Sequence, residues 1–252
     1  MRRLLALCLM LSLAACDPPY AFEHAAPPSA FAAALADPQR PAADRERDAA
    51  RYPEQLLTFA QVGEGEKVGD YIMGGGYWTR ILSNVVGPTG KVYAFQPAEF
   101  IGFRPAYATE QDAAVAGRAN VVALRGPVAA PPFPEPLDTI ITVQNLHDLY
   151  IGAMPPGTGS RAIAALYAAL KPGGVLVVVD HSAPPGSGTT MTNALHRIDR
   201  QAAIDAIKAA GFRLEAESPL YARPADPRTK NVFDPSIRGE TDQFTLRFRK
   251  PA

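Results

Sequence analysis

The segment Lys67-Val-Gly-Asp70-Tyr-Ile-Met-Gly74-Gly75-Gly76-Tyr77-Trp-Thr-Arg-Ile-Leu82 combines three local patterns in succession. Its apolar start predicts a strand, its glycines a sharp turn, and residues 77–82 the beginning of a helix. Consecutive glycines let a backbone approach a ligand closely, and a helix N-terminus offers free N–H groups. The segment therefore favours a site for a nucleotide-type cofactor, although a tight turn alone would also use glycines in this way.

A second strand is expected at residues 91–95, Lys-Val-Tyr-Ala-Phe, because β-branched and aromatic residues here lie between Gly87-Pro88 and Pro97. The two strands and the helix between them form a β-α-β unit. In such units the second strand often ends in an acidic residue that binds a ribose. The corresponding residue here is Gln96, which can bond a hydroxyl group without a charge.

Further strands are expected at residues 120–124, 138–143 and 175–180, with an antiparallel pair at 211–217 and 243–249. A helix is expected at residues 160–170, and another that begins near Asn193 and holds His196, Arg197, Asp199 and Arg200. Residues 218–242 have little periodicity and several prolines. A loop of this length in a compact domain is usually a lid or disordered.

With these motifs in place, the sequence resembles the class I S-adenosylmethionine-dependent methyltransferases from about Asp37 to Pro251, and more closely a group of predicted bacterial exported methyltransferases. In that family an acidic residue ends the first strand and Gly-x-Gly-x-Gly follows. Asp70, Gly74 and Gly76 match this motif, and Ile72 replaces its first glycine. The strongest single match is residues 170–174, Leu-Lys-Pro-Gly-Gly, before an apolar strand.

The resemblance implies an α/β fold: a single Rossmann-like methyltransferase domain with a seven-stranded, mostly parallel sheet, an antiparallel last strand and helices on both faces. It also implies S-adenosylmethionine as the cofactor. The cofactor-binding residues that it indicates are Asp70, Gly74, Gly75, Gly76, Gln96 and Asn145. The aromatic residues Tyr77 and Trp78 can contact ligand, but packing under the glycine loop is the commoner role for such side chains.

Polar residues follow the expected fourth and fifth strands, at the edge where ligands bind in doubly wound sheets. These strands are neighbours in the family's usual order, so their ends should lie side by side. A histidine paired with an aspartate can act as a base, because its pKa lies near neutrality. The predicted catalytic residues are His147, Asp148, Asp180, His181 and His196.

Two other interpretations of these histidines remain open. Each could cap a helix or bond a backbone carbonyl. Alternatively, histidine and aspartate from the same loops could hold a divalent metal. No residue is assigned as a metal ligand from the sequence, because it lacks a tight His-x-x-His or His-x-Asp spacing.

The N-terminus has the charged start and short apolar core of an export signal, which is too short to span a membrane. Residues 13–16, Leu-Ala-Ala-Cys, resemble the bacterial lipobox, which implies a lipidated Cys16 as the first mature residue. The alternative is an ordinary export signal cut after Ala15. The expected division is a signal peptide at 1–15, an Ala/Pro-rich tether at 16–41 and the methyltransferase-like domain at 42–252. The mature chain would be lipid-anchored on the periplasmic face of a bacterial membrane.

The amino-acid composition limits the number of domains and the kinds of partner that we expect. The chain has 252 residues, 47% of them hydrophobic, which suits one domain with a full core. Lys and Arg number 25, as do Asp and Glu, and no basic run occurs, so nucleic acid is not an expected partner. Residues 44–51 carry mixed charges at helical spacing; a solvated helix face is the favoured interpretation and a cover for the cofactor pocket the alternative.

These observations lead us to expect a methyltransferase that acts on a small molecule or an envelope component. Two alternatives remain: an exported binding protein or pseudoenzyme that keeps the fold, and a metal-dependent enzyme on the same scaffold.

Overall fold

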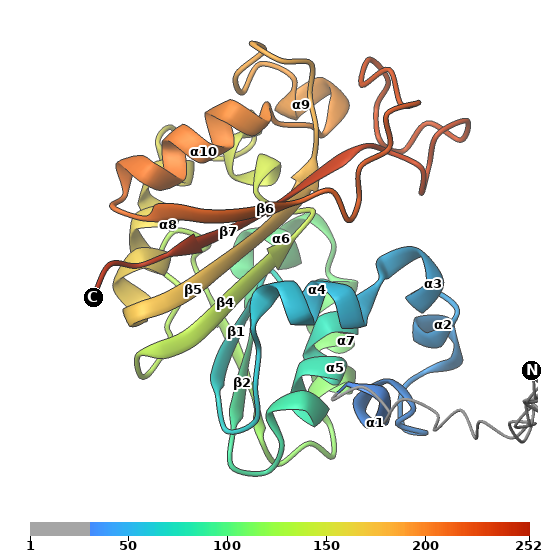
Figure 1. Ribbon diagram of the computed structural model, residues 1–252, viewed down its shortest axis with the longest axis vertical. Coiled ribbons are helices and arrows are strands. Elements are labelled where there is room, and N and C mark those ends of the chain that lie inside the picture. Colours follow the sequence, from blue (N-terminus) through green and yellow to red (C-terminus); the bar gives the residue numbers. More distant parts are fainter. Residues whose placement is uncertain (1–30) are drawn as a thin grey trace, which may run out of the picture.

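The computed structural model describes residues 31–252, which form one seven-stranded sheet with the order β3-β2-β1-β4-β5-β7-β6 (Figure 1). Neighbouring strands pair in parallel, except that β7 is antiparallel to both β5 and β6. The expected fold is therefore confirmed. The strands are β1 (Lys67–Tyr71), β2 (Lys91–Pro97), β3 (Val121–Gly126), β4 (Leu137–Val143), β5 (Leu170–His181), β6 (Arg213–Ser218) and β7 (Gln243–Arg249).

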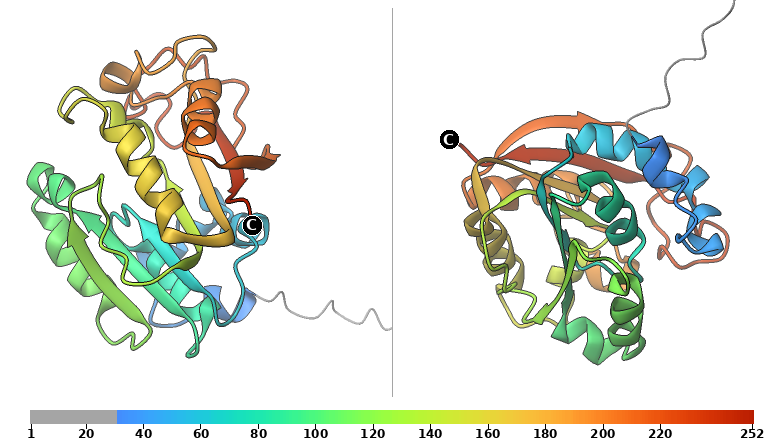
Figure 2. Two further views of the ribbon diagram at one scale, coloured as in Figure 1. Left: turned by 90° about the vertical axis from the view of Figure 1, so that its left-hand side faces the viewer. Right: turned by 90° about the horizontal axis from the view of Figure 1, so that it is seen from below.

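Helices cover both faces of this sheet (Figures 1 and 2). Because successive strand residues point to opposite faces, Val177 and Val179 of β5 pack with α4 (Pro53–Ala60) and α5 (Tyr77–Val86). Leu176 and Val178 pack on the other face with α8 (Thr158–Ala169) and α10 (Arg200–Ala209). The central strand is buried on both sides, as a continuous apolar run requires.

Of the remaining helices, α7 (Ala106–Val115) packs beside α5 on β2 and β3, and the others are short. They are α1 (Ala32–Leu35), α2 (Ala42–Arg45), α3 (Asp48–Arg51), α6 (Ala98–Phe103), η1 (His147–Tyr150) and α9 (Thr192–Leu195). Among residues 31–252, no helix has the length and apolarity needed to cross a membrane. The predicted signal peptide and Cys16 lie outside the described residues.

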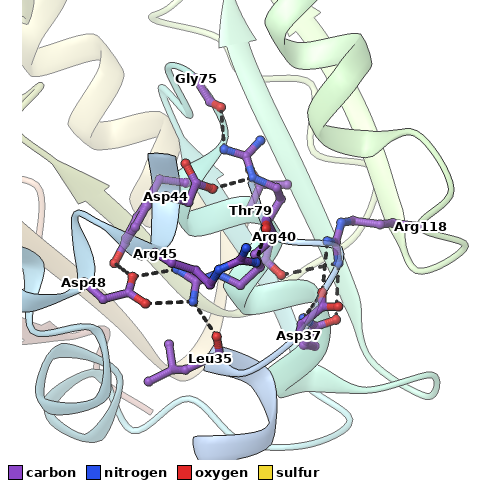
Figure 3. Close-up of polar contacts among 12 residues, drawn as sticks. Leu35, Asp37, Arg40, Asp44, Arg45, Asp48, Gly75, Thr79 and Arg118 are labelled. Atoms are coloured by element: carbon purple, nitrogen blue, oxygen red, sulfur yellow. Dashed lines mark hydrogen bonds and ion pairs between the residues drawn. The ribbon is translucent and has the colours of Figure 1, made fainter. Parts of the chain in front are cut away.

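The first described residues are not the tether that the sequence predicted over residues 16–41. Helix α1 packs against α5, and the buried guanidinium of Arg40 donates to the Leu35 carbonyl at 2.7 Å. Asp37 pairs with Arg118 at 3.2 Å (Figure 3). These partners, far along the chain, fix residues 31–41 onto the domain.

The start of β5 and the helix expected after it also differ in detail from the prediction. Strand β5 begins at Leu170, which pairs with Leu137, and the pairing resumes at Val175 after a bulge. The single helix expected from residue 193 is divided in two. His196, which follows α9, has φ +53°, and the Asp199 side chain accepts from the Gln201 N–H to cap α10.

Residues 219–242 contain no helix or strand, yet buried polar contacts hold them. The buried Arg197 pairs with Asp226 at 2.8 Å, and Asp226 accepts from the Asp242 N–H at 2.7 Å. This segment is drawn in orange to red beside α9 (Figure 1), and its Val232 and Phe233 line the cavity at the carboxyl ends of the strands. Of the two predicted alternatives, these contacts contradict disorder, and we refer to the ordered residues 219–242 as the lid.

Candidate active site

The glycine loop that follows β1 keeps a left-handed backbone where the resembled family has its first glycine. Ile72 has φ +62°, a conformation that a β-branched residue rarely adopts. Its side chain is buried in the core, and its carbonyl accepts from Asn145 Nδ2 at 3.1 Å. Such strain costs about 1–3 kcal/mol and persists only where surrounding contacts impose it. Ile72 therefore holds a backbone conformation that glycine would adopt without strain.

The three glycines of the loop have different roles. Gly74 has φ +55°, and a Cβ there would meet no atom within 4 Å, so this residue faces open space. Gly75 also lies beside the cavity. At Gly76 a Cβ would lie 2.3 Å from the Ala114 Cβ of α7. Gly76 is thus needed for helix packing, and its role in binding cofactor stays a prediction.

Two polar residues predicted to bind cofactor have distinct environments. Asp70 is buried, accepts from Thr79 Oγ1 at 2.6 Å, and has its pKa raised to about 6 by that burial. It borders the cavity. Gln96 is also buried, but neither amide atom has a partner among the described residues, and it is not part of the cavity wall. An unpaired buried amide costs about 1–3 kcal/mol and calls for an explanation.

Residues 40–51 cover the glycine loop and are not the solvated helix face that the sequence favoured. Arg80 connects the Asp44 carboxylate, at 2.6 Å, with the Gly75 carbonyl, at 2.9 Å. Asp48 accepts from Arg40 at 2.6 Å and from the Tyr77 hydroxyl at 2.7 Å. Figure 3 shows Arg40 pointing toward Asp48 and Leu35. The cover is held by ion pairs whose partners come from α5 and its own short helices.

Two arginines of this cover face the cavity without a carboxylate partner. The guanidinium groups of Arg47 and Arg51 lie over the Tyr77 ring, at 5.4 and 4.7 Å from its centroid. Among residues 31–252, neither forms an ion pair. Burial and the neighbouring charge of Arg47 lower the pKa of Arg51 to about 10. These groups are free to bind an anion.

The ends of β4 and β5 bring the predicted catalytic residues together. Asp180 is fully buried behind the cavity, where its carboxylate lies 2.7 Å from His147 Nδ1. It also accepts from the backbone N–H groups of His147 and His181, both at 2.7 Å. The Nε2 atom of His147 lies 3.2 Å from an Asp148 carboxylate oxygen. Asp180 thus orients the His147 ring and leaves Nε2 toward Asp148.

The two other histidines flank this pair. His196 Nδ1 is 3.7 Å from the same Asp148 oxygen, and its ring packs edge-on against His147 with centroids 5.4 Å apart. The His181 Nδ1 atom lies 2.9 Å from the Thr241 hydroxyl. All four residues, His147, Asp148, His181 and His196, line the cavity. The prediction that strands four and five place these residues side by side is confirmed.

The histidine pKa values differ from the near-neutral value that the sequence suggested. Burial opposes the charged form of His147, but the Asp180 and Asp148 carboxylates outweigh it and raise its pKa to about 10. Burial lowers the pKa of His181 to about 4. Burial and the charge of His147 also lower the pKa of His196. The carboxylates thus favour the charged form of His147, whereas burial favours the neutral form of His196, whose ring is partly open to the cavity.

One cavity of about 430 Å³ joins the glycine loop to the histidine cluster. A second, of about 400 Å³, shares walls with it at Arg51, Trp78 and Phe233. Ile72, Gln144 and His196 all line the first cavity and all have positive φ, the pattern of strain found at functional sites. The two adjoining spaces are of a size that suits small ligands.

Several aromatic residues of the cavity wall were not identified from the sequence. Phe100 and Tyr107 come from α6 and α7, and Phe233 comes from the lid. Tyr77 and Trp78 are buried and line the same cavity, so they both pack under the loop and face the ligand space. Tyr77 and Trp78 were the only aromatic residues of this wall that the sequence indicated.

Comparison with family models gives no match, and comparison with curated proteins gives none. Several solved structures are similar. An S-adenosylmethionine-dependent methyltransferase from Aquifex aeolicus has 19% identity and a TM-score of 0.54, over 81% of this chain and 92% of that one. An arsenic(III) S-adenosylmethionine methyltransferase from Chlamydomonas reinhardtii has 19% identity and a TM-score of 0.51, over 90% and 75%.

The [4+2]-cyclase SpnF is similar to the same extent, with 18% identity and a TM-score of 0.56 over 81% of each chain. Its name shows that this fold also serves a reaction other than methyl transfer, so the fold alone does not assign the chemistry. Identities this low establish the architecture only. The chain has the Rossmann-like fold of the class I S-adenosylmethionine-dependent methyltransferases.

Proposed function

We propose that this chain is an S-adenosylmethionine-dependent methyltransferase that acts on a small-molecule or envelope acceptor. The observation that carries the proposal is the continuous cavity between the glycine loop and the histidine cluster. A cofactor at the loop and an acceptor at the cluster would lie within one enclosed space. Bringing two reactants together in this way removes much of the entropic barrier to reaction.

The residues at the loop fit such a cofactor. Gly74 leaves open space where any side chain would project, and Asn145 ties the loop to the end of β4 through the Ile72 and Val143 carbonyls. Gln96, the residue expected to bind the ribose, keeps both amide atoms unpaired but lies off the cavity wall, so its contact with the cofactor rests on the family resemblance alone. Arg47 and Arg51 offer cations to a carboxylate, either of the cofactor or of the acceptor.

The histidine cluster fits the acceptor side. The cofactor, when bound, supplies a methyl group activated on a sulfonium. The acceptor oxygen or nitrogen must lose a proton, and in the metal-free protein neutral His196 takes it, with Asp148 beside it to stabilise the resulting imidazolium. His147 remains protonated and held by Asp180, so it orients the acceptor through Nε2–H.

The test of cofactor binding is calorimetry of the full-length protein with S-adenosylmethionine and S-adenosylhomocysteine. We expect both to bind with 1:1 stoichiometry, and the Gly74→Val variant to lose binding while its circular dichroism spectrum is retained. An absence of binding by the folded wild-type protein would overturn the proposal.

Transfer is tested separately, with cofactor carrying a radioactive methyl group and an envelope extract as the source of acceptor. His196→Ala should lower the turnover number by about 10²–10⁴-fold without changing cofactor affinity. Binding of cofactor with no transfer to any envelope fraction would instead support the binding-protein alternative.

We also propose that the mature protein is anchored in the membrane by an acylated Cys16, on the basis of the Leu-Ala-Ala-Cys pattern. The Cys16→Ser variant should be released from membranes or remain unprocessed. A variant that still fractionates with membranes at its mature size would contradict this location.

A further inference from the structure

Three side chains at the ligand edge converge on one point in the cavity. They are His147 through Nε2, Asp148 through a carboxylate oxygen and His196 through Nδ1, and their ligand atoms all lie within 4.8 Å of one another. From this geometry we propose that His147, Asp148 and His196 bind one divalent transition-metal ion. The site does not depend on the proposed methyl transfer.

The spacing of the three atoms suits a metal. Zinc bonds to histidine nitrogen and carboxylate oxygen are about 2.0–2.2 Å long, so ligand atoms around a tetrahedral ion lie roughly 3.4 Å apart. The Asp148 oxygen is 3.2 Å from His147 Nε2 and 3.7 Å from His196 Nδ1. Shifts of a few tenths of an ångström in these two separations would bring them to the tetrahedral value.

Asp180 supplies the support that metal-binding histidines usually have. Its buried carboxylate holds His147 Nδ1–H at 2.7 Å, so a metal would displace the proton from Nε2, the atom that faces Asp148, and bind there. A carboxylate on the far nitrogen of a ligand histidine fixes the ring and raises its basicity. The Asp180 oxygens are themselves fixed by two backbone N–H groups.

The charges of the carboxylates at this cluster also favour a divalent metal ion. Asp148 and Asp180 both lie at this cluster, and among residues 31–252 neither forms an ion pair with a lysine or an arginine. Their only cationic partners are histidines. A divalent ion would neutralise both carboxylates while leaving the imidazoles uncharged, which a single proton on His147 cannot do.

The third ligand, His196, is held in place by its backbone conformation and by ring packing. His196 has φ +53° directly after α9, an arrangement that costs free energy and needs surrounding contacts to maintain it. Its ring packs against the His147 and Phe233 rings, at centroid distances of 5.4 and 5.0 Å. This packing directs Nδ1 toward Asp148 before any ion binds.

The ligand types indicate the class of metal. Two imidazoles and one carboxylate suit Zn²⁺ and neighbouring transition ions, whereas Mg²⁺ and Ca²⁺ prefer oxygen ligands. Three protein ligands beside a cavity leave at least one coordination position for a ligand oxygen. If the proposed function holds, the ion would acidify an acceptor hydroxyl there and take over the role given to His196 in the metal-free protein.

The experiment uses full-length protein freed of metal by chelation, then titrated with Zn²⁺ by calorimetry and with Co²⁺ by visible absorption spectroscopy. We expect one ion per site and a Co²⁺ spectrum with d–d bands. Asp148→Asn and His196→Ala should each weaken Zn²⁺ binding by on the order of 100-fold or more, and Asp180→Asn by about 10–100-fold.

His181→Ala is the matched control, because His181 lies at the same edge but uses Nδ1 toward Thr241 and belongs to no ligand set. It should bind Zn²⁺ as the wild type does. Circular dichroism confirms that each variant is folded. Wild-type protein that binds neither ion at micromolar concentration, or Asp148→Asn and His196→Ala variants that bind Zn²⁺ with unchanged affinity, would overturn the site.

Cofactor titrations of the metal-free protein separate this inference from the proposed function. Binding of S-adenosylmethionine without any metal site would overturn the metal inference alone. A metal site in a protein that binds no S-adenosylmethionine would overturn the methyltransferase proposal and leave the metal site standing.

Discussion

Replacing Asp180 by asparagine tests whether the buried carboxylate holds the histidine cluster together. Its two oxygens accept from His147 Nδ1, from the His147 backbone N–H and from the His181 backbone N–H, all at 2.7 Å. An asparagine side chain has the same shape but presents an NH₂ group in place of one oxygen. Either orientation of the amide therefore sets a donor against a donor in a fully buried position.

The expected loss of stability is large and depends on pH. Removing one partner of a buried ion pair costs about 3–5 kcal/mol. The pKa of His147, 6.5 in the unfolded chain, is about 10 in the fold, so its pairing contributes stability below pH 6.5 that is lost as pH rises through 10. The pKa of Asp180 is lowered from 3.8, despite burial, by His147; its contribution is therefore lost only below pH 3.8.

We therefore expect Asp180→Asn to lower the free energy of unfolding by about 3–5 kcal/mol at pH 6. At pH 10 the difference should fall to about 1–3 kcal/mol, because only the mismatched buried donor remains. Urea denaturation followed by the fluorescence of Trp78, the single tryptophan, measures both values. Asp205→Asn on the exposed face of α10 is the matched control. A difference below about 1 kcal/mol at pH 6, or one that is equal at pH 6 and pH 10, would refute the reasoning.

Four further substitutions distinguish the parts of the site. Gly74→Val should abolish S-adenosylmethionine binding at a cost of about 1–2 kcal/mol in stability, whereas Gly76→Val should unfold or strongly destabilise the domain, because its Cβ would meet Ala114 at 2.3 Å. Equal melting temperatures for the two variants would contradict this. Arg51→Gln should weaken S-adenosylmethionine binding about tenfold in calorimetry, an effect smaller at high salt; unchanged affinity would mean that the arginine binds the acceptor instead. Phe233→Ala should speed cofactor release, measured by stopped flow, with an unchanged melting temperature, since the ring is 57% exposed. A release rate equal to that of the wild type would show that the lid does not retain the cofactor.

The order of strands and helices could be predicted because the patterns that specify it are local. Apolar residues in β-branched runs, the glycines at 74–76 and the Pro-Gly-Gly at 172–174 restrict the chain over a few neighbouring residues. The same reasoning placed Asp180 and His147 together, since parallel neighbouring strands end at one edge. Which strands are neighbours came from the family resemblance.

Which residues of the site face the cavity could not be predicted from local patterns. Gly74 and Gly76 are equivalent in the sequence, but only the packing of α7 shows that one faces a cavity and the other meets Ala114. In the same way, Gln96 stands at the expected position of the second strand, yet the fold buries its amide off the cavity wall.

The amino-acid sequence by itself determined the elements, their order and the set of ionisable residues at the ligand edge. Tertiary structure alone decided that residues 40–51 cover the glycine loop, that Phe233 lines the cavity and that the pKa of His147 rises while that of His196 falls. The physical reason is that the two kinds of interaction act over different separations along the chain. Backbone preferences act between near neighbours in the chain, whereas burial, ion pairing and pKa depend on which distant residues the folded chain brings within a few ångströms.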